Sequence, residues 1–247
     1  MDTQMKSRKE LKQEAKDALA GRWGSAILMT LVPNLIIIAI VIVLTTPMMA
    51  SSIMATDLLD SAAASDTLDT ALILAVSSRA AVMFLISLVA GLFQIVLESG
   101  ADYTFLDTVR GRKNEPYRIA DAFRCFRSPY IWGLIITMLL VSIFSYLWSL
   151  LFIIPGVIKA YSYSQSYFVF YDIAEGTGEK PGALECITAS RRLMKGYKWN
   201  LFVLQLSFIG WGILASITVI GMLWFIPYVK ATQAAFYNAL PNEVDTY

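Results

Sequence analysis

The feature that most limits how this chain can fold is a charge-free apolar run near its C-terminus. Residues 201–223 contain no Asp, Glu, Lys or Arg, and a basic segment that ends in Trp199 comes directly before them. A second apolar segment, which carries Pro227 and Lys230, follows after a turn. A helix of about 20 apolar residues crosses the ~30 Å hydrocarbon core of a bilayer. The stretch 190–237 therefore predicts a helical hairpin in a membrane.

Composition extends this interpretation to the whole chain. Of the 247 residues, 57% are hydrophobic and only 16% are charged, whereas soluble domains average about 45–50% and about 25%. So few charges cannot cover a water-exposed surface, and we expect most of the chain to face lipid. Residues 1–24 are polar and basic and do not resemble a cleaved signal peptide.

Apolar runs of similar length recur along the chain. We expect spans at about 25–46, 80–97, 131–154, 157–172, 200–220 and 222–240. The second helix should continue past its span through residues 103–106, and Pro155-Gly156 should form a tight turn. Residues 47–78 are rich in Ser, Thr, Ala and Asp and contain no Lys or Arg. We expect them to form an acidic external loop with room for a short helix.

The basic residues predict the orientation of these spans. All but three of the 20 lysines and arginines lie before span one, between spans two and three, or between spans four and five. The exceptions are Arg79, Lys159 and Lys230. Because cytoplasmic loops carry the excess of Lys and Arg, six spans with both termini in the cytoplasm fit this distribution. The expected location is the bacterial plasma membrane.

Each basic segment also carries apolar residues at helical spacing, at 7–20, 118–127 and 182–195. In the first, Ser7 and Glu10 have the spacing of a capping box, in which each side chain accepts from the other residue's backbone N–H. The apolar stripe comprises Leu11, Ala15, Ala18 and Leu19. Such a segment is either a short solvated helix or an amphipathic helix on the inner leaflet, with its cations toward anionic headgroups. We favour the second interpretation because a span follows directly.

These segments and spans suggest three repeats, at about 7–107, 118–172 and 182–240. Each unit has a basic segment, a rim containing Trp, and a helical hairpin. Two hairpin tips share a Pro, Lys and Ala: FIIPGVIKA at 152–160 and WFIPYVKA at 224–231. Chance similarity between apolar segments is the alternative. The predicted fold is one all-α integral membrane domain of six transmembrane helices in three hairpin repeats, each preceded by a cytoplasmic amphipathic helix.

Two stretches resemble a known family. LKQEAKDALAGRWGSAI near the start, and SRRLMKGYKWNLFVLQLSFIGWGIL followed by WFIPYVKATQAAFY near the end, are similar to a family of Gram-positive bacterial membrane proteins. This family is catalogued only as a domain of unknown function, DUF975. The resemblance covers nearly the whole chain and is weakest at 47–78. It implies a polytopic plasma-membrane protein of unknown activity, and it supplies no catalytic residues.

Polar residues inside the expected spans are the candidate functional residues, because a charge in the bilayer centre costs at least ~2.5–3.5 kcal/mol and so faces other helices or a wet cavity. They form one stripe in each of three spans: Gln94, Glu98 and Asp102; Lys159, Ser162, Tyr163 and Ser166; Lys230, Gln233 and Tyr237. We expect these stripes to line one polar cavity. Lys230 should pair there with Glu98, and Asp102 should lie one turn further along.

Two alternatives to a functional cavity remain open. The stripes could form a polar core with a purely structural role, or some of the residues could lie at the rims of the bilayer. Lys159 lies close to the outer turn and can extend its ammonium to water. In the cavity interpretation, Gln233 and Ser166 would complete the hydrogen bonding of Lys230.

No enzyme is expected. The chain has no histidine, the commonest general base, and no carboxylate dyad or phosphate loop stands out. Two cysteines, Cys125 and Cys186, are too few for a zinc site, and their cytoplasmic segments argue against a disulfide. No metal, cofactor or nucleic acid is expected to bind.

Two classes of function remain. One is transport or handling of a small molecule, lipid or amphiphile through the polar cavity. The other is a non-transporting membrane factor, in envelope stress, immunity or complex stabilisation, that binds a membrane-protein partner or a second copy of itself. Anionic lipid headgroups at the cytoplasmic face are expected partners in both.

Overall fold

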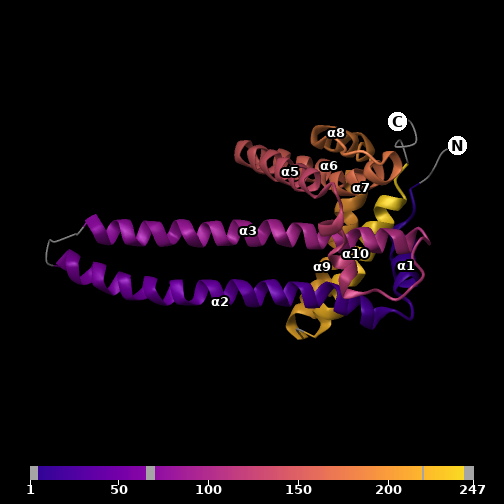
Figure 1. Ribbon diagram of the computed structural model, residues 1–247. Helices are drawn as coiled ribbons and strands as arrows, with labels where there is room; N and C mark the ends of the chain where they lie inside the picture. Colours follow the sequence, from indigo (N-terminus) through magenta and orange to yellow (C-terminus); the bar gives the residue numbers. More distant parts are fainter. Residues whose placement is uncertain (1–4, 65–69, 219, 242–247) are drawn as a thin grey trace. The chain divides into compact units, whose positions relative to one another are not determined.

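The computed structural model describes residues 5–64, 70–218 and 220–241, and these residues form helices without any strand (Figure 1). The α-helices are α1 Arg8–Leu19, α2 Trp23–Ala64, α3 Thr70–Val109, α4 Ile119–Ala122, α5 Ile131–Leu151, α6 Ile153–Tyr163, α7 Ser166–Thr177, α8 Ala183–Leu193, α9 Lys198–Thr218 and α10 Gly221–Asn238. A short 3-10 helix, η1, covers Arg124–Arg127. The chain divides into two compact units, one of residues 32–94 and one of the remaining residues.

Among the residues that the structure describes, four helices are long and apolar enough to cross a membrane. They are Trp23–Ser51 within α2, Ser77–Val109 within α3, Ile131–Leu151 and Lys198–Thr218. The predicted all-helical class with several membrane-length helices is confirmed. The expected second span does continue as helix past residue 106, because α3 ends at Val109.

The expected fourth span is not one helix. Residues 157–172 are divided between α6 and α7, with Ser164 and Gln165 between them. The turn before it is also displaced: the chain leaves helical geometry at Phe152 (φ −155°, ψ 137°), so that Pro155 lies in the first turn of α6. A proline is tolerated there because the first N–H groups of a helix have no intrahelical partner.

The stretch 47–78 is not the loop that the sequence predicts. α2 continues through Pro47 to Ala64, and α3 begins at Thr70; residues 65–69 lie outside the described part of the chain. The stretch contains many Ala, Leu and Met residues, which are strong helix formers. This preference outweighs the Ser, Thr and Asp residues that suggested a loop.

The smaller unit is a hairpin of α2 and α3. Within it, the side-chain amide of Gln94 donates to Asn34 Oδ1 at 2.6 Å. The guanidinium of Arg79 donates to the Ser51 carbonyl at 3.3 Å. Many of its large apolar side chains point outward and are exposed, as lipid-facing residues are.

α1 begins with the predicted capping box. The Ser7 N–H donates to Glu10 Oε2 at 2.7 Å, and the Glu10 N–H donates to Ser7 Oγ at 3.3 Å. The apolar stripe of α1, however, is buried in the protein, where Leu11 is 2% exposed. α1 packs against α10. The stripe is thus used for packing within the protein, and the expected position of α1 on the inner leaflet stays a prediction.

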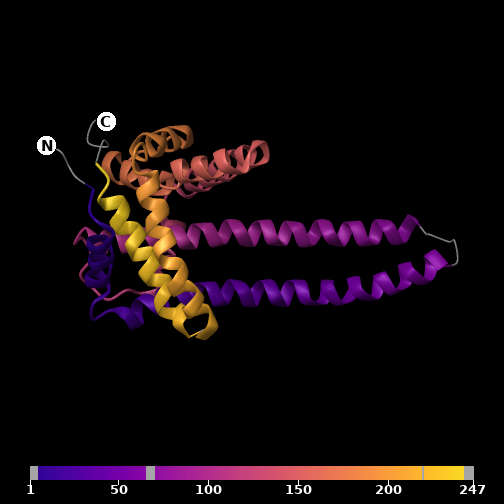
Figure 2. The same ribbon diagram turned by 180° about the vertical axis from the view of Figure 1, so that it is seen from behind.

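The other two basic segments differ from each other. Residues 118–127 fold as the single-turn α4 followed by η1, whereas 182–195 contain the longer helix α8. The hairpins that follow them, α5–α6 and α9–α10, run in different directions in both views (Figures 1 and 2). In the α9–α10 hairpin, Gly221 lets the start of α10 lie close to α9, because a Cβ at this position would lie 2.9 Å from Ala215 Cα.

Candidate functional site

Lys230 is held between two carboxylates of α3. Its Nζ lies 3.0 Å from Asp102 Oδ1 and 3.8 Å from Glu98 Oε2. The side chains of Lys230 and Asp102 are only 15% and 10% exposed. Glu98 and Asp102 share one face of α3 because they are four residues apart. The sequence predicts the pair with Glu98, and the structure contains it, but Asp102 is the nearer partner and makes the hydrogen bond.

The second predicted stripe belongs to a joint between helices. Ser190 Oγ of α8 donates to the Ser162 carbonyl at 2.8 Å and accepts from the Gln165 N–H at 3.2 Å. This one hydroxyl satisfies backbone groups on both sides of the break between α6 and α7. Ser166 Oγ donates to the Tyr163 carbonyl at 2.8 Å, so Ser166 does not complete the hydrogen bonding of Lys230 as predicted.

The remaining predicted residues also have separate neighbours. The ammonium of Lys159 lies 4.5 Å from the ring centroid of Trp148 in α5. Gln94 belongs to the hairpin unit, Gln233 is half-buried, and the Tyr237 hydroxyl donates to Asp172 Oδ2 at 2.7 Å. The structure thus brings together Lys230, Glu98 and Asp102 and gives the other candidates different surroundings.

An ionic cluster that sequence reasoning missed lies where α3, α7 and α10 meet. Arg110 binds Asp172 through two hydrogen bonds, of 2.5 Å and 2.8 Å, and its Nε donates to Asn238 Oδ1 at 3.2 Å. Asp172 also accepts from Tyr237, as described above. From the sequence alone, Arg110 indicates only the cytoplasmic side of the membrane. The acidic residue at the inner end of the expected fourth span was the signal that could have revealed this pair.

A second cluster adjoins η1. Arg124 lies 2.6 Å from Asp107 Oδ2 and 2.9 Å from the Tyr171 hydroxyl. That hydroxyl is 2.9 Å from both Asp107 oxygens and 2.8 Å from Glu175 Oε1. Arg112 binds the other oxygen of Glu175 at 2.8 Å. These bonds connect α3, η1 and α7.

Both buried guanidiniums remain charged. Burial by itself lowers the pKa of Arg110 and of Arg124. The hydrogen bonds that they donate to Asp172 and Asp107, together with the charges of the acidic and phenolic groups around them, outweigh burial, and the pKa of each arginine is raised. Both guanidiniums therefore carry a positive charge at physiological pH.

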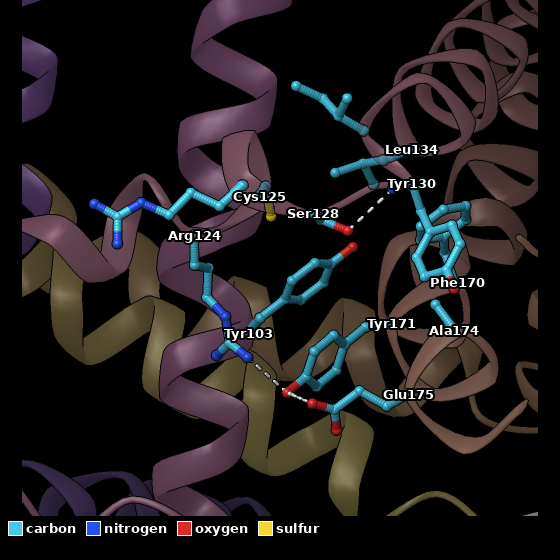
Figure 3. Close-up of a pocket in the computed structure, with 12 residues that line it drawn as sticks. Tyr103, Arg124, Cys125, Ser128, Tyr130, Leu134, Phe170, Tyr171, Ala174 and Glu175 are labelled. Carbon is cyan, nitrogen blue, oxygen red and sulfur yellow. Dashed lines mark hydrogen bonds between the residues drawn. The ribbon is translucent and has the colours of Figure 1, made fainter. Parts of the chain in front are cut away.

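A pocket of about 260 Å³ lies beside the second cluster (Figure 3). Tyr103 and Tyr171 stack with ring centroids 4.4 Å apart on one side of it, and Tyr130 and Phe170 lie across from them. Ser128 and Glu175 supply polar atoms. The complete lining is Tyr103, Arg124, Cys125, Arg127, Ser128, Tyr130, Ile131, Leu134, Phe170, Tyr171, Ala174 and Glu175.

The lining of this pocket offers aromatic and polar contacts. Cys125 faces it, but burial raises the pKa of its thiol to about 12. The thiol therefore remains protonated and is a poor nucleophile, because the thiolate is the reactive form. Within the described ranges, no group of three His, Cys, Asp or Glu side chains could hold a metal ion. Aromatic faces and a carboxylate suit a small molecule with an apolar body and a polar end.

The comparisons with known proteins identify a family. A family model described as "Protein of unknown function (DUF975)" matches residues 5–162 and 153–243, which together cover nearly the whole chain. The chain belongs to the DUF975 family. No curated protein and no solved structure matches it. The predicted resemblance to the DUF975 family is confirmed, the Gram-positive origin stays a prediction, and membership of this family assigns no activity.

Proposed function

We propose that this DUF975 protein is a non-enzymatic, multi-pass plasma-membrane protein that binds and handles a small molecule or amphiphile. The pocket of Figure 3 is the observation that carries the proposal. Its volume of about 260 Å³ lies just below the ~300–1,000 Å³ of drug-sized sites, so it suits a small ligand or a single headgroup. The pocket replaces the shared cavity that the polar stripes suggested.

The proposed topology has six spans with both termini in the cytoplasm. In this topology α5 would end at the outer face of the membrane, near residue 152. The basic segment before α9 can lie at the inner face only if α6 and α7 together cross the membrane. α9 would then cross to the outer face, and α10 would bring the C-terminus back to the cytoplasm. The similar tips of two hairpins support three repeats. Anionic headgroups are the proposed partners of the cytoplasmic basic segments, which we do not expect to bind nucleic acid.

Cysteine labelling tests this topology. After replacement of Cys125 and Cys186 by Ala, a Cys introduced at Ser61 should react with an impermeant maleimide in whole cells, and one at Asn114 should react only after permeabilisation. The reverse pattern would overturn the orientation.

Filling the pocket tests the binding function. Ala174 lines the pocket, and Ala174→Phe would place a ring in it; Ala160→Phe, at an exposed position of α6, is the matched control. We would measure thermal shifts of the full chain in nanodiscs with short-chain amphiphiles that carry cationic, zwitterionic or anionic headgroups. One class should stabilise the wild type and the control but not Ala174→Phe. Equal responses from both variants, or no response from the wild type, would contradict the proposal.

A second candidate function is that of a non-transporting membrane factor. The direct pairing of Lys230 with Asp102, and of Arg110 with Asp172, favours it, because these charges already satisfy one another. Such a protein would act in envelope stress, immunity or complex stabilisation through a partner, of which a second copy of the chain is the simplest. If the partner is a second copy of the chain, native mass spectrometry from nanodiscs should show a dimer. A strict monomer would exclude self-association.

A further inference from the structure

A second, larger hollow lies among α1, α9 and α10. It has a volume of about 630 Å³ and belongs entirely to the larger unit. Its lining is Lys12, Lys16, Trp23, Trp211, Leu214, Ala215, Thr218, Gly221, Trp224, Phe225 and Tyr228. Two ammonium groups of α1 thus stand over a floor of aromatic and aliphatic side chains. We call this hollow the α1 groove.

The cationic side of the α1 groove has excess positive charge. Burial, followed by the positive charges of Arg8 and Lys16, lowers the pKa of Lys12, and no carboxylate contributes to the shift. The acids close to these lysines in sequence have other partners: Glu14 binds Lys6 at 2.7 Å, Glu10 accepts from the Ser7 N–H, and Asp17 accepts from the Gln13 amide. The ammonium of Lys12 lies 4.5 Å from the Phe208 ring centroid. An anion between Lys12 and Lys16 would relieve the repulsion between them.

The apolar side of the α1 groove is open. Trp211 is 66% exposed and Trp224 is 49% exposed. Exposed indoles beside lysines are typical of the membrane–water interface, where an amphipathic ring lies at headgroup level. Tyr228 completes the aromatic floor, with its ring edge-on to Phe208 at 5.6 Å. A small soluble anion would use the lysines but would leave this floor uncovered.

We propose that the α1 groove binds one anionic phospholipid of the inner leaflet. The phosphate lies between Lys12 and Lys16, and the first part of an acyl chain runs along Trp211, Trp224 and Phe225. This inference rests on the proposed membrane location and cytoplasmic N-terminus, but not on the small-molecule pocket. It assigns α1 a role that its buried apolar stripe leaves open: the stripe attaches α1 to α10, and the lysines on another side hold the lipid.

Lipid retention by the full chain tests the proposal. The protein would be placed in nanodiscs of phosphatidylcholine and phosphatidylglycerol in equal parts and then examined by native mass spectrometry. The wild type should retain one phosphatidylglycerol in preference to phosphatidylcholine, and Lys12→Gln with Lys16→Gln should lose that preference. The control is Arg192→Gln with Lys195→Gln, which removes the same charge near the end of α8 and should keep the preference.

Trp224→Ala tests the apolar half separately. It should weaken the retention of phosphatidylglycerol and reduce quenching of Trp fluorescence by brominated acyl chains, while Ala160→Phe should change neither. Equal losses in the α8 control and the α1 variant would show general surface attraction and overturn the proposal. Retention that is unchanged in both the α1 variant and Trp224→Ala would also overturn it. The small-molecule pocket can fail its own test without affecting these results.

Discussion

Lys159 and Lys230 occupy hairpin tips of similar sequence but have different surroundings. The ammonium of Lys230 lies between Asp102 and Glu98, whereas that of Lys159 lies over the ring of Trp148 in its own hairpin. The first lysine therefore joins α10 to a helix far away in the sequence, and the second strengthens only a local contact. Similar motifs can thus differ in the free energy that they contribute to the fold.

A one-residue offset accounts for part of this difference. Lys159 is the fourth residue after Pro155, and Lys230 is the third residue after Pro227. One residue turns a side chain by about 100° around an α-helix, because a turn contains 3.6 residues. The prolines also differ in position, since Pro155 lies in the first turn of α6 and Pro227 lies inside α10. The two lysines therefore point toward different neighbours.

The largest expected effect is that of Lys230→Met. It leaves Asp102, whose side chain is 10% exposed, without its cation. Removing one member of a buried ion pair typically costs about 3–5 kcal/mol. We expect a loss of this size in the free energy of unfolding, measured by denaturant titration in detergent micelles. Lys159→Met is the matched control and should lose much less.

Double variants sharpen this prediction. Lys230→Met combined with Asp102→Asn should be more stable than Lys230→Met alone, because no buried carboxylate remains uncompensated. A smaller recovery is expected with Glu98→Gln, since the Glu98 side chain is 46% exposed. Strictly additive losses would mean that Lys230 and the two acids do not interact, and the contrast between the lysines would disappear.

The next effect concerns the residue that follows each tip proline, Gly156 in one hairpin and Tyr228 in the other. A Cβ on Gly156 would lie 2.6 Å from Ser149 Cα, which is backbone and cannot move aside without separating α5 from α6. Gly156→Ala should therefore cost about 1–3 kcal/mol, as overpacked sites do. Thermal unfolding in detergent would measure the loss.

Gly210→Ala is the control for this change. A Cβ at Gly210 meets no atom within 4 Å, and Ala is favoured over Gly in a helix by up to ~1 kcal/mol. We expect this variant to be at least as stable as the wild type. A stable Gly156→Ala variant would show that the two hairpins are equally tolerant at their tips.

The smallest effect is that of Lys159→Met. It removes a cation from the face of Trp148, an interaction worth about 0.5–1 kcal/mol at an exposed site. Trp148→Leu should cost more, because it also removes buried area. The double variant should lose less stability than the sum of the two single variants, because the cation–π interaction can be lost only once. A loss as large as that of Lys230→Met would indicate that Lys159 has an additional ionic partner.

The all-helical membrane class was predictable because hydropathy and charge are properties of local sequence. The capping box at Ser7 was predictable for the same reason, and so was a counter-charge for Lys230, since a deep ammonium requires one. Which of Glu98 and Asp102 lies nearer to Lys230 could not be predicted, because this depends on how α10 packs against α3. At 47–78 the Ser, Thr and Asp content suggested a loop, but the helix propensity of the Ala, Leu and Met residues prevails in the described part of this stretch.

The two ionic clusters of Arg110 and Arg124 could not be predicted from the sequence, because they depend on tertiary packing. Arg110 and Arg124 belong to a basic stretch that is already accounted for as a cytoplasmic segment. The stretch therefore gives no reason to expect a buried acidic partner. Their partners are distant in the sequence: Asp172 is 62 residues from Arg110, and Asp107 is 64 residues from Tyr171, which shares its cluster. Only the packing of α3 and α7 with η1 and α10 brings these charges together.

The pairing of Asp102 with Lys230 also affects the biosynthesis of the protein. The two residues are 128 positions apart, so Asp102 enters the membrane long before its counter-charge has been translated. At ~5–20 residues per second, the carboxylate waits on the order of 10 s. During that interval it needs water, a proton or an insertion chaperone. A chain truncated before α10 would keep the unpaired acid, which membrane quality-control proteases could recognise.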